Sequence, residues 1–245
     1  APRLAEFAAN SEIGRAVLAR CLDIDRRRSL PAFGVPLRKR MGGRGTGGTR
    51  PAVVLLPDCF CAYGESDIGL ASVRVLEHIG FDVHVPSLGC CGRPAISTGL
   101  LAEARRTIGR TATALSTALR ETKAVAVVGA EPSCVSALRD EWLDLDLAVD
   151  RSALEEIAEK TQPIEDFVAG HLQETHDGAP VVVHGHCHQK ALGSLAPTVD
   201  LLRRVSREVT LLDTGCCGMA GSFGYTRGHY DCLLYTSPSP RDTLL

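Results

Sequence analysis

The sequence predicts an α/β fold made of two similar repeats, each a small parallel sheet flanked by helices. Short apolar runs typical of buried strands alternate with segments of helical periodicity. The chain also repeats itself, since Pro51–Cys59 corresponds to Pro180–Cys187, and Leu88–Gly92 corresponds to Thr214–Gly218. Repeats of this length predict two lobes related by pseudo-symmetry, with cysteines at the carboxyl ends of their strands.

Length and composition exclude several classes of protein. The 245 residues can bury a sizeable core, and 44% hydrophobic with 23% charged residues are typical of a globular chain. A net charge of -2 and an aromatic content of 4% give no reason to expect a nucleic-acid partner. No apolar segment resembles a signal peptide or reaches the roughly 18 residues of a membrane span. We therefore expect a cytoplasmic protein with reduced cysteines.

Residues 1–50 are expected to form a helical segment followed by a basic, glycine-rich linker. The helical segment has apolar residues at helical spacing, namely Leu4, Phe7, Ile13, Val17 and Leu18. The linker covers residues 37–50 and is expected to be mobile, because it combines basic residues with glycine.

Residues 51–150 form the first repeat, in which strands at 53–56, 81–85 and 124–128 alternate with two helices. The helices are indicated by apolar residues at helical spacing: Leu70, Val73, Leu76 and Ile79, then Leu101, Ala104, Ile108, Leu115 and Leu119. A cysteine follows each strand, and the carboxyl ends of parallel strands share one edge of the sheet. We therefore expect four cysteines to converge there: Cys59, Cys90, Cys91 and Cys134.

Residues 151–179 are expected to be connecting helices, and residues 180–231 a second, incomplete repeat. This repeat has strands at 181–183 and 209–212, which lead to Cys187, Cys216 and Cys217. A third strand does not follow, because residues 232–245 have no core-forming pattern and resemble a translated sequencing adaptor. We therefore expect a truncated second repeat and a non-native tail, which is excluded from the fold.

The doublets Cys90-Cys91-Gly92 and Cys216-Cys217-Gly218 are interpreted as ligands, because a repeated Cys-Cys-Gly at strand ends is not a packing device. Thiolates bind iron–sulfur clusters or zinc, and both need about four donors. Cys61 is a further candidate donor, whereas Cys21 is interpreted as an ordinary helix residue. Two adjacent thiolates do not easily bind the same tetrahedral metal ion, whereas a cluster with several iron atoms can bind each of them at a different iron.

Histidines flank Cys187 on both sides. We interpret His186 and His188 as hydrogen-bond partners beside a cluster rather than as direct ligands. A different interpretation is a structural zinc ion held by Cys187 with one of these histidines, and this alternative stays open.

Three segments resemble the CCG cysteine-rich domain family: Glu131–Cys134, His184–Leu192 and Gly215–Tyr225. This family includes the B subunit of heterodisulfide reductase, iron–sulfur subunits of glycolate and lactate oxidation, and the C subunit of anaerobic glycerol-3-phosphate dehydrogenase. The segments look most like the C-terminal part of fused FAD-linked oxidase and iron–sulfur proteins. Residues 22–36 look like the linker that follows a ferredoxin-type domain in such proteins.

The resemblance implies an iron–sulfur electron-transfer module with a 4Fe–4S cluster. Electrons would pass from a flavoprotein that oxidises lactate, glycolate or glycerol-3-phosphate to a quinone or another acceptor, with peripheral contact at the inner membrane face. FAD and the ferredoxin-type domain would lie on an absent domain or partner, so the chain is expected to be a fragment of an oxidoreductase, and no catalytic residue is assigned. The implied ligand sets are Cys59, Cys90, Cys91 and Cys134, and, incompletely, Cys187, Cys216 and Cys217.

The sequence departs from the heterodisulfide reductase pattern at Glu131, where that pattern has a cysteine. We therefore place Glu131 beside the cluster with His186 and His188, and expect the first set to have one thiolate fewer. Two alternatives remain beside the electron carrier. The cluster itself could act on a disulfide substrate, as in heterodisulfide reductases, or the chain could be a structural zinc protein.

Overall fold

The computed structural model describes residues 2–42, 49–173, 175, 177–192, 195–213, 215–219 and 223–236. The chain forms two compact units. The larger unit is Pro36–Leu212, and the terminal unit joins Ala1–Val35 with Asp213–Leu245. No helix in the described part of the chain combines the length and the apolar character that crossing a membrane requires.

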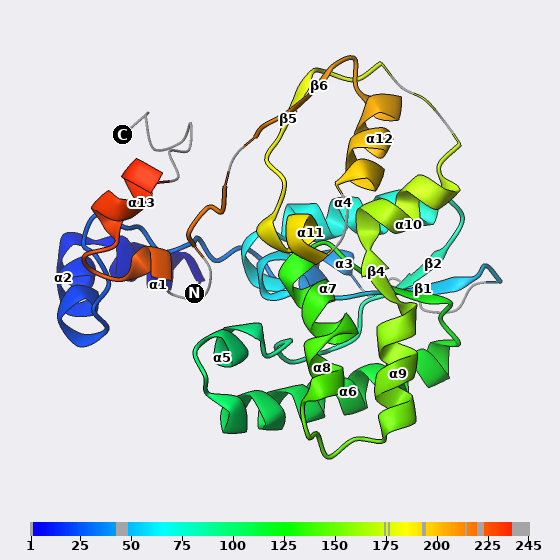
Figure 1. The fold of residues 1–245 in the computed structure, drawn as a ribbon, viewed down its shortest axis with the longest axis horizontal. Helices are drawn as coiled ribbons and strands as arrows, with labels where there is room; N and C mark the ends of the chain where they lie inside the picture. Colours follow the sequence, from blue (N-terminus) through cyan, green and yellow to red (C-terminus); the bar gives the residue numbers. More distant parts are fainter. Residues whose placement is uncertain are drawn as a thin grey trace. The chain divides into compact units, whose positions relative to one another are not determined.

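The larger unit is organised around a four-stranded parallel sheet in the order β2-β1-β3-β4 (Figure 1). Its strands are β1 (Ala52–Leu55), β2 (Asp82–His84), β3 (Ala126–Gly129) and β4 (Thr161–Pro163). Val54 of the central β1 pairs with His84 on one side and Val127 on the other. The parallel α/β arrangement that the sequence predicts is therefore confirmed, as are its first three strands.

Helices cover both faces of this sheet (Figure 1). One face packs against α6 (Leu101–Thr122), α7 (Pro132–Arg139), α8 (Glu141–Asp144) and α9 (Arg151–Lys160). The other face packs against α4 (Ser66–His78), α10 (Ile164–His171) and α12 (Ala196–Val205). Because both faces are covered, Val53, Val54 and Leu55 are all buried, which explains why β1 reads as a continuous apolar run.

Strand β4 is a difference from the prediction, because residues 151–179 were expected to contain helices alone. The segment consists of α9, β4 and α10, and β4 adds a parallel edge to the sheet. Its sequence Thr161-Gln162-Pro163 has no apolar run, so periodicity could not reveal it. An edge strand tolerates Pro163, since a proline there removes a donor that the ladder does not need.

The linker prediction for residues 37–50 is wrong at its start. Leu37–Met41 forms the short helix α3, and Leu37 is buried against Gly69 of α4. An added Cβ at Gly69 would lie 2.7 Å from Leu37 Cδ2, so the leucine anchors this helix to the larger unit. Residues 43–48 lie outside the described residues.

The second predicted sheet is present in the larger unit as two parallel strands, β5 (Val181–Val183) and β6 (Val209–Leu211). The connection between them contains α11 (Cys187–Leu192) and α12, as the βαβ pattern requires. Val182 and Leu211 remain exposed, so this sheet is far less covered than the first one.

The terminal unit consists of α1 (Pro2–Asn10), α2 (Glu12–Cys21), the 3-10 turn η2 (Phe223–Tyr225) and α13 (Tyr230–Thr236). The predicted N-terminal helical segment is broken at Ser11, which caps α2 by accepting a hydrogen bond from the Gly14 amide at 3.0 Å. Helix α13 extends through residues 232–236 of the expected tail, and residues 237–245 lie outside the described residues.

Buried Asp25 makes the terminal unit sensitive to acid. Two hydrogen bonds from the Arg27 guanidinium, at 3.0 and 2.8 Å, lower the pKa of Asp25 from 3.8 to about 2. The stabilisation is complete above the unfolded pKa of about 4 and is lost as the pH falls towards 2. We expect the urea midpoint of the terminal unit to fall over this range in the wild type and less steeply in Asp25→Asn. Identical slopes in both proteins would contradict this assignment.

Candidate metal centre

Four cysteines lie together at the carboxyl edge of the four-stranded sheet. Cys59 follows β1 and caps the π-helical turn η1 (Phe60–Gly64), whereas Cys90 and Cys91 follow β2. Cys134 lies in the first turn of α7, after β3. The Sγ atoms of Cys91 and Cys134 lie 3.0 Å apart, and Cys59, Cys90 and Cys91 are near enough to shift one another's pKa values. The four cysteines that were expected at the carboxyl ends of the strands thus lie together in the structure.

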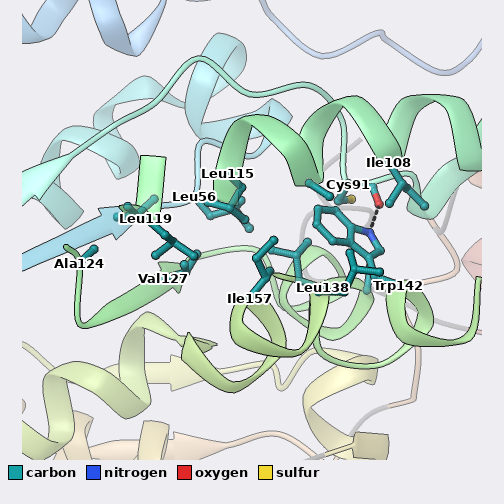
Figure 2. Close-up of a cluster of buried hydrophobic side chains, with 14 of the residues drawn as sticks. Leu56, Cys91, Ile108, Leu115, Leu119, Ala124, Val127, Leu138, Trp142 and Ile157 are labelled. Atoms are coloured by element: carbon teal, nitrogen blue, oxygen red, sulfur yellow. Dashed lines mark hydrogen bonds between the residues drawn. The ribbon is translucent and has the colours of Figure 1, made fainter. Parts of the chain in front are cut away.

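The backbone of the doublet is held by contacts from distant helices. Thr111 of α6 donates to the Cys90 carbonyl at 3.0 Å, and the Trp142 indole donates to the Cys91 carbonyl at 2.9 Å (Figure 2). Gly92 has a φ of 83°, and its amide donates to Cys90 Sγ at 3.4 Å. These bonds leave little freedom for the two sulfur atoms.

The turn that presents Cys59 is fixed by the buried carboxylate of Asp58. Its Oδ1 accepts hydrogen bonds from the amides of Phe60 and Cys61, at 2.9 and 3.0 Å. Asp58, Thr111 and Trp142 are positioning residues that the sequence analysis missed. The position of Asp58 directly before Cys59 is a signal for such a turn, whereas Thr111 and Trp142 give no local signal because they act across the fold.

Electrostatics in this cluster favour a single negative charge shared between neighbours. Hydrogen bonds from the thiols of Cys59 and Cys91 lower the pKa of Cys90 to about 2. The same contacts raise the pKa values of Cys59 and Cys91 above their ordinary range. Thiolates this close repel one another, so full ionisation of the set requires cations placed between them.

The chemistry of this donor set fits an iron–sulfur cluster. Such clusters are held by about four cysteine thiolates, and here four thiols from three loops meet at one sheet edge. Among the described side chains, no group of three Cys, His, Asp or Glu is arranged around a single metal position.

The predicted histidines and Glu131 lie in the larger unit, where α11 packs against α7 (Figure 1). His186 Nε2 lies 3.7 Å from Glu131 Oε1. The His188 amide donates to His186 Nδ1 at 3.2 Å, which leaves the Nε2 of His186 to carry a proton towards Glu131. On the neighbouring ring, Nε2 of His188 lies 3.0 Å from Nη2 of Arg93. Glu131 Oε1 also accepts from the Ser133 amide at 3.2 Å, which caps α7.

The second doublet belongs to the terminal unit, whereas Cys187 belongs to the larger one. Cys216 and Cys217 are exposed. Their local geometry repeats that of the first doublet, since the Gly218 amide donates to Cys216 Sγ at 3.4 Å and Gly218 has a φ of 67°. The same short motif therefore folds in the same way twice.

Replacing Gly92 by alanine is expected to destabilise the doublet. The left-handed φ of 83° costs an alanine roughly 1–2 kcal/mol. The new Cβ would also lie 2.5 Å from Ile108 Cγ1. We expect a loss of about 2 kcal/mol in the free energy of unfolding, measured with urea. Gly99→Ala is the matched control, because Gly99 also has a positive φ but has no atom within 4 Å of an added Cβ. An equal loss in both variants would show that the contact with Ile108 contributes nothing.

Comparisons with known proteins place this site in a family. Residues 53–139 match the model of the cysteine-rich domain called CCG, and this range contains the four cysteines. The C subunit of the anaerobic glycerol-3-phosphate dehydrogenase of Escherichia coli K12 is 30% identical over 234 residues, covering 88% of this chain and 56% of the relative. The chain thus spans about half the length of that relative.

Shorter relatives are covered more completely. Lactate utilization protein A of Bacillus velezensis is 30% identical over 181 residues, which cover 70% of this chain and 74% of the relative. The protein of the same name from an Exiguobacterium species is 32% identical over 183 residues, covering 71% and 73%. No solved structure matches the chain. With the four thiols converging inside the matched range, these similarities show that the chain belongs to the CCG cysteine-rich domain family.

Proposed function

We propose that the chain is an iron–sulfur electron-transfer module of an FAD-linked dehydrogenase. The observation that carries this proposal is the meeting of four thiols, delivered by three adjacent strand ends and near enough to shift one another's pKa values. A bound cluster of the 4Fe–4S type would accept and pass on one electron at a time. Cys59, Cys90, Cys91 and Cys134 hold it, while Asp58, Thr111 and Trp142 fix the loops that present these thiols.

The names of the relatives support the choice of partners. One relative is named for anaerobic glycerol-3-phosphate dehydrogenase and the other for lactate utilization. We therefore propose that the electron donor is a flavoprotein that oxidises a 2-hydroxy acid or glycerol-3-phosphate. FAD lies on that partner, a ferredoxin-type iron–sulfur domain precedes this module, and a quinone is the proposed acceptor. A quinone acceptor requires peripheral contact with the membrane surface.

Cys216 and Cys217 are proposed as ligands of a second, incomplete set. Their support is the repeated geometry of the Cys-Cys-Gly motif, with the same amide-to-sulfur hydrogen bond as in the first doublet.

The test is a measurement of iron and acid-labile sulfide per chain in protein prepared without oxygen. We expect iron with matching sulfide and a visible absorption band in the wild type, and a loss of at least half of both in Cys90→Ser/Cys91→Ser. Cys21→Ser is the control, because Cys21 is exposed in the terminal unit and lies outside the cluster. Stoichiometric zinc without iron, or iron that is unchanged in the double variant, would refute the proposal.

A further inference from the structure

We infer that the larger unit has a further binding site, for a small zwitterion with an apolar side chain, such as a neutral amino acid. The site is a cavity of about 500 Å³ between strand β2 and the last turn of α6, here called the edge cavity. Cavities of this size are typical of sites for small organic molecules. None of the described residues that line it is a cysteine, so the edge cavity is separate from the metal centre.

The imidazole of His84, the last residue of β2, is the buried polar group of the edge cavity. His84 is only 7% exposed, and neither of its ring nitrogens has a hydrogen-bond partner among the described residues. None of the sealed side-chain atoms without a partner in that part of the chain belongs to His84. Its ring nitrogens therefore have access to the open space of the cavity. Because an unpaired buried polar group is unfavourable, a polar ligand atom would supply the missing partner.

The sheet places this ring on the face that α6 covers. His84 pairs with Val54 of β1, which belongs to the apolar cluster that includes the buried residues of α6. The preceding residue, Val83, packs with the cluster on the opposite face. Since side chains alternate along a strand, Asp82 and His84 lie on the same face, and both line the edge cavity.

The edge cavity carries one side chain of each charge that has no partner among the described residues. Arg50 and Asp82 neutralise each other, since Arg50 Nε donates to Asp82 Oδ1 at 3.0 Å and the Arg50 amide donates to Oδ2 at 3.2 Å. Glu121 and Lys123 line the same cavity and are exposed, and within the described part of the chain their side chains form no hydrogen bond or ion pair. They are the charges left to interact with a ligand.

A zwitterion matches this lining better than a simple anion or cation does. Helix α6 ends at Thr122, and the partial negative charge of its last carbonyls acts with Glu121 to favour an ammonium group. Lys123 and the His84 ring are left to bind a carboxylate. The remaining lining is apolar and suits a hydrocarbon side chain, since it consists of Pro51, Ala52, Val85, Pro86, Ala118 and Val125 apart from the Thr122 side chain.

The test uses the full chain and three ligands of matched shape, titrated in a calorimeter. Leucine carries both charges, 4-methylpentanoate lacks the ammonium group, and 3-methylbutylamine lacks the carboxylate. We expect leucine to bind at least tenfold more tightly than either of the others. The ring signals of His84 in the nuclear magnetic resonance spectrum, assigned with His84→Gln, should shift as leucine is added.

Two variants test the charged groups without disturbing the core. Lys123 has a φ of 52°, which glycine adopts readily, so Lys123→Gly removes the ammonium group without straining the backbone. We expect Lys123→Gly and Glu121→Gln each to weaken leucine binding about two- to fivefold, the range of an exposed ion pair. Lys39→Gln and Glu159→Gln are the controls, because they remove the same charges from exposed positions on α3 and α9 and should leave binding unchanged.

The other outcomes would overturn the inference. If 4-methylpentanoate or 3-methylbutylamine binds as tightly as leucine, the edge cavity is a site for anions or for cations and not for zwitterions. The absence of both heat and a His84 shift at ligand concentrations of about 10 mM would exclude the site altogether. Leucine binding that is unchanged in Lys123→Gly and Glu121→Gln would exclude this cavity as its location. Iron per chain plays no part in these measurements, so the proposed function stands or fails separately.

Discussion

Replacing Trp142 by alanine is expected to lower the free energy of unfolding by about 3–5 kcal/mol. The side chain is completely buried and belongs to the cluster that joins the sheet to α6, α7 and α9 (Figure 2). Its removal creates a cavity beside Cys91 and leaves the Cys91 carbonyl without its hydrogen bond. We therefore expect iron per chain to fall as well, because the doublet loses one of its fixed points.

Two further variants separate packing from positioning. Trp142→Phe keeps much of the apolar volume but removes the indole donor, at an expected cost of about 1–3 kcal/mol. Leu115→Ala opens a cavity of similar cost, about 2–5 kcal/mol, in the same cluster. Unfolding in urea is followed by circular dichroism, because Trp142 is the single tryptophan of the sequence. Iron should fall in Trp142→Phe and persist in folded Leu115→Ala, and the reverse order would refute a positioning role for Trp142.

The sheet edge could be predicted because each of its parts has a local signal. The apolar runs of β1 and β3 mark buried strands, and a cysteine follows each of them at the end where parallel strands meet. Only the sequence was needed to place Cys59, Cys90, Cys91 and Cys134 together. The repeat also had a local signal, and its two glycines, Gly92 and Gly218, have the same left-handed backbone in the structure.

Other features depend on contacts between distant residues and could not be predicted. Strand β4 has no apolar pattern and exists because β3 offers it a free edge. Leu37 looked like part of a basic linker, yet Gly69 leaves space for it on α4. The apolar residues of α1 show the opposite case, since Leu4 and Phe7 are 70% and 75% exposed although their spacing predicts a buried face. Periodicity identifies a face but not what covers it.

The pair Cys59 and Cys61 provides the sharpest contrast between a ligand and a packing residue. Cys59 is exposed, and its thiol contacts Cys90. Cys61 is 5% exposed, lies beside the Asp58 carboxylate, and its Cβ would be 3.4 Å from an added Cβ at Gly69. Burial and the Asp58 carboxylate raise the pKa of the Cys61 thiol, as contacts with neighbouring thiols raise those of Cys59 and Cys91. Cys61 therefore differs from the ligand candidates in its surroundings, next to Asp58 and Gly69, and not in the direction of its pKa shift.

We therefore expect opposite effects from two alanine substitutions only two positions apart. Cys59→Ala should lose at least half of the iron, while the stability of the metal-free chain changes by no more than about 0.5 kcal/mol. Cys61→Ala should retain iron and lose about 1 kcal/mol of stability through the small cavity that it opens. Iron analysis and urea unfolding of both metal-free variants measure the two effects. If Cys61→Ala loses iron as Cys59→Ala does, then the turn at Asp58 presents both thiols to the cluster, and burial in the metal-free chain does not identify which cysteines are ligands.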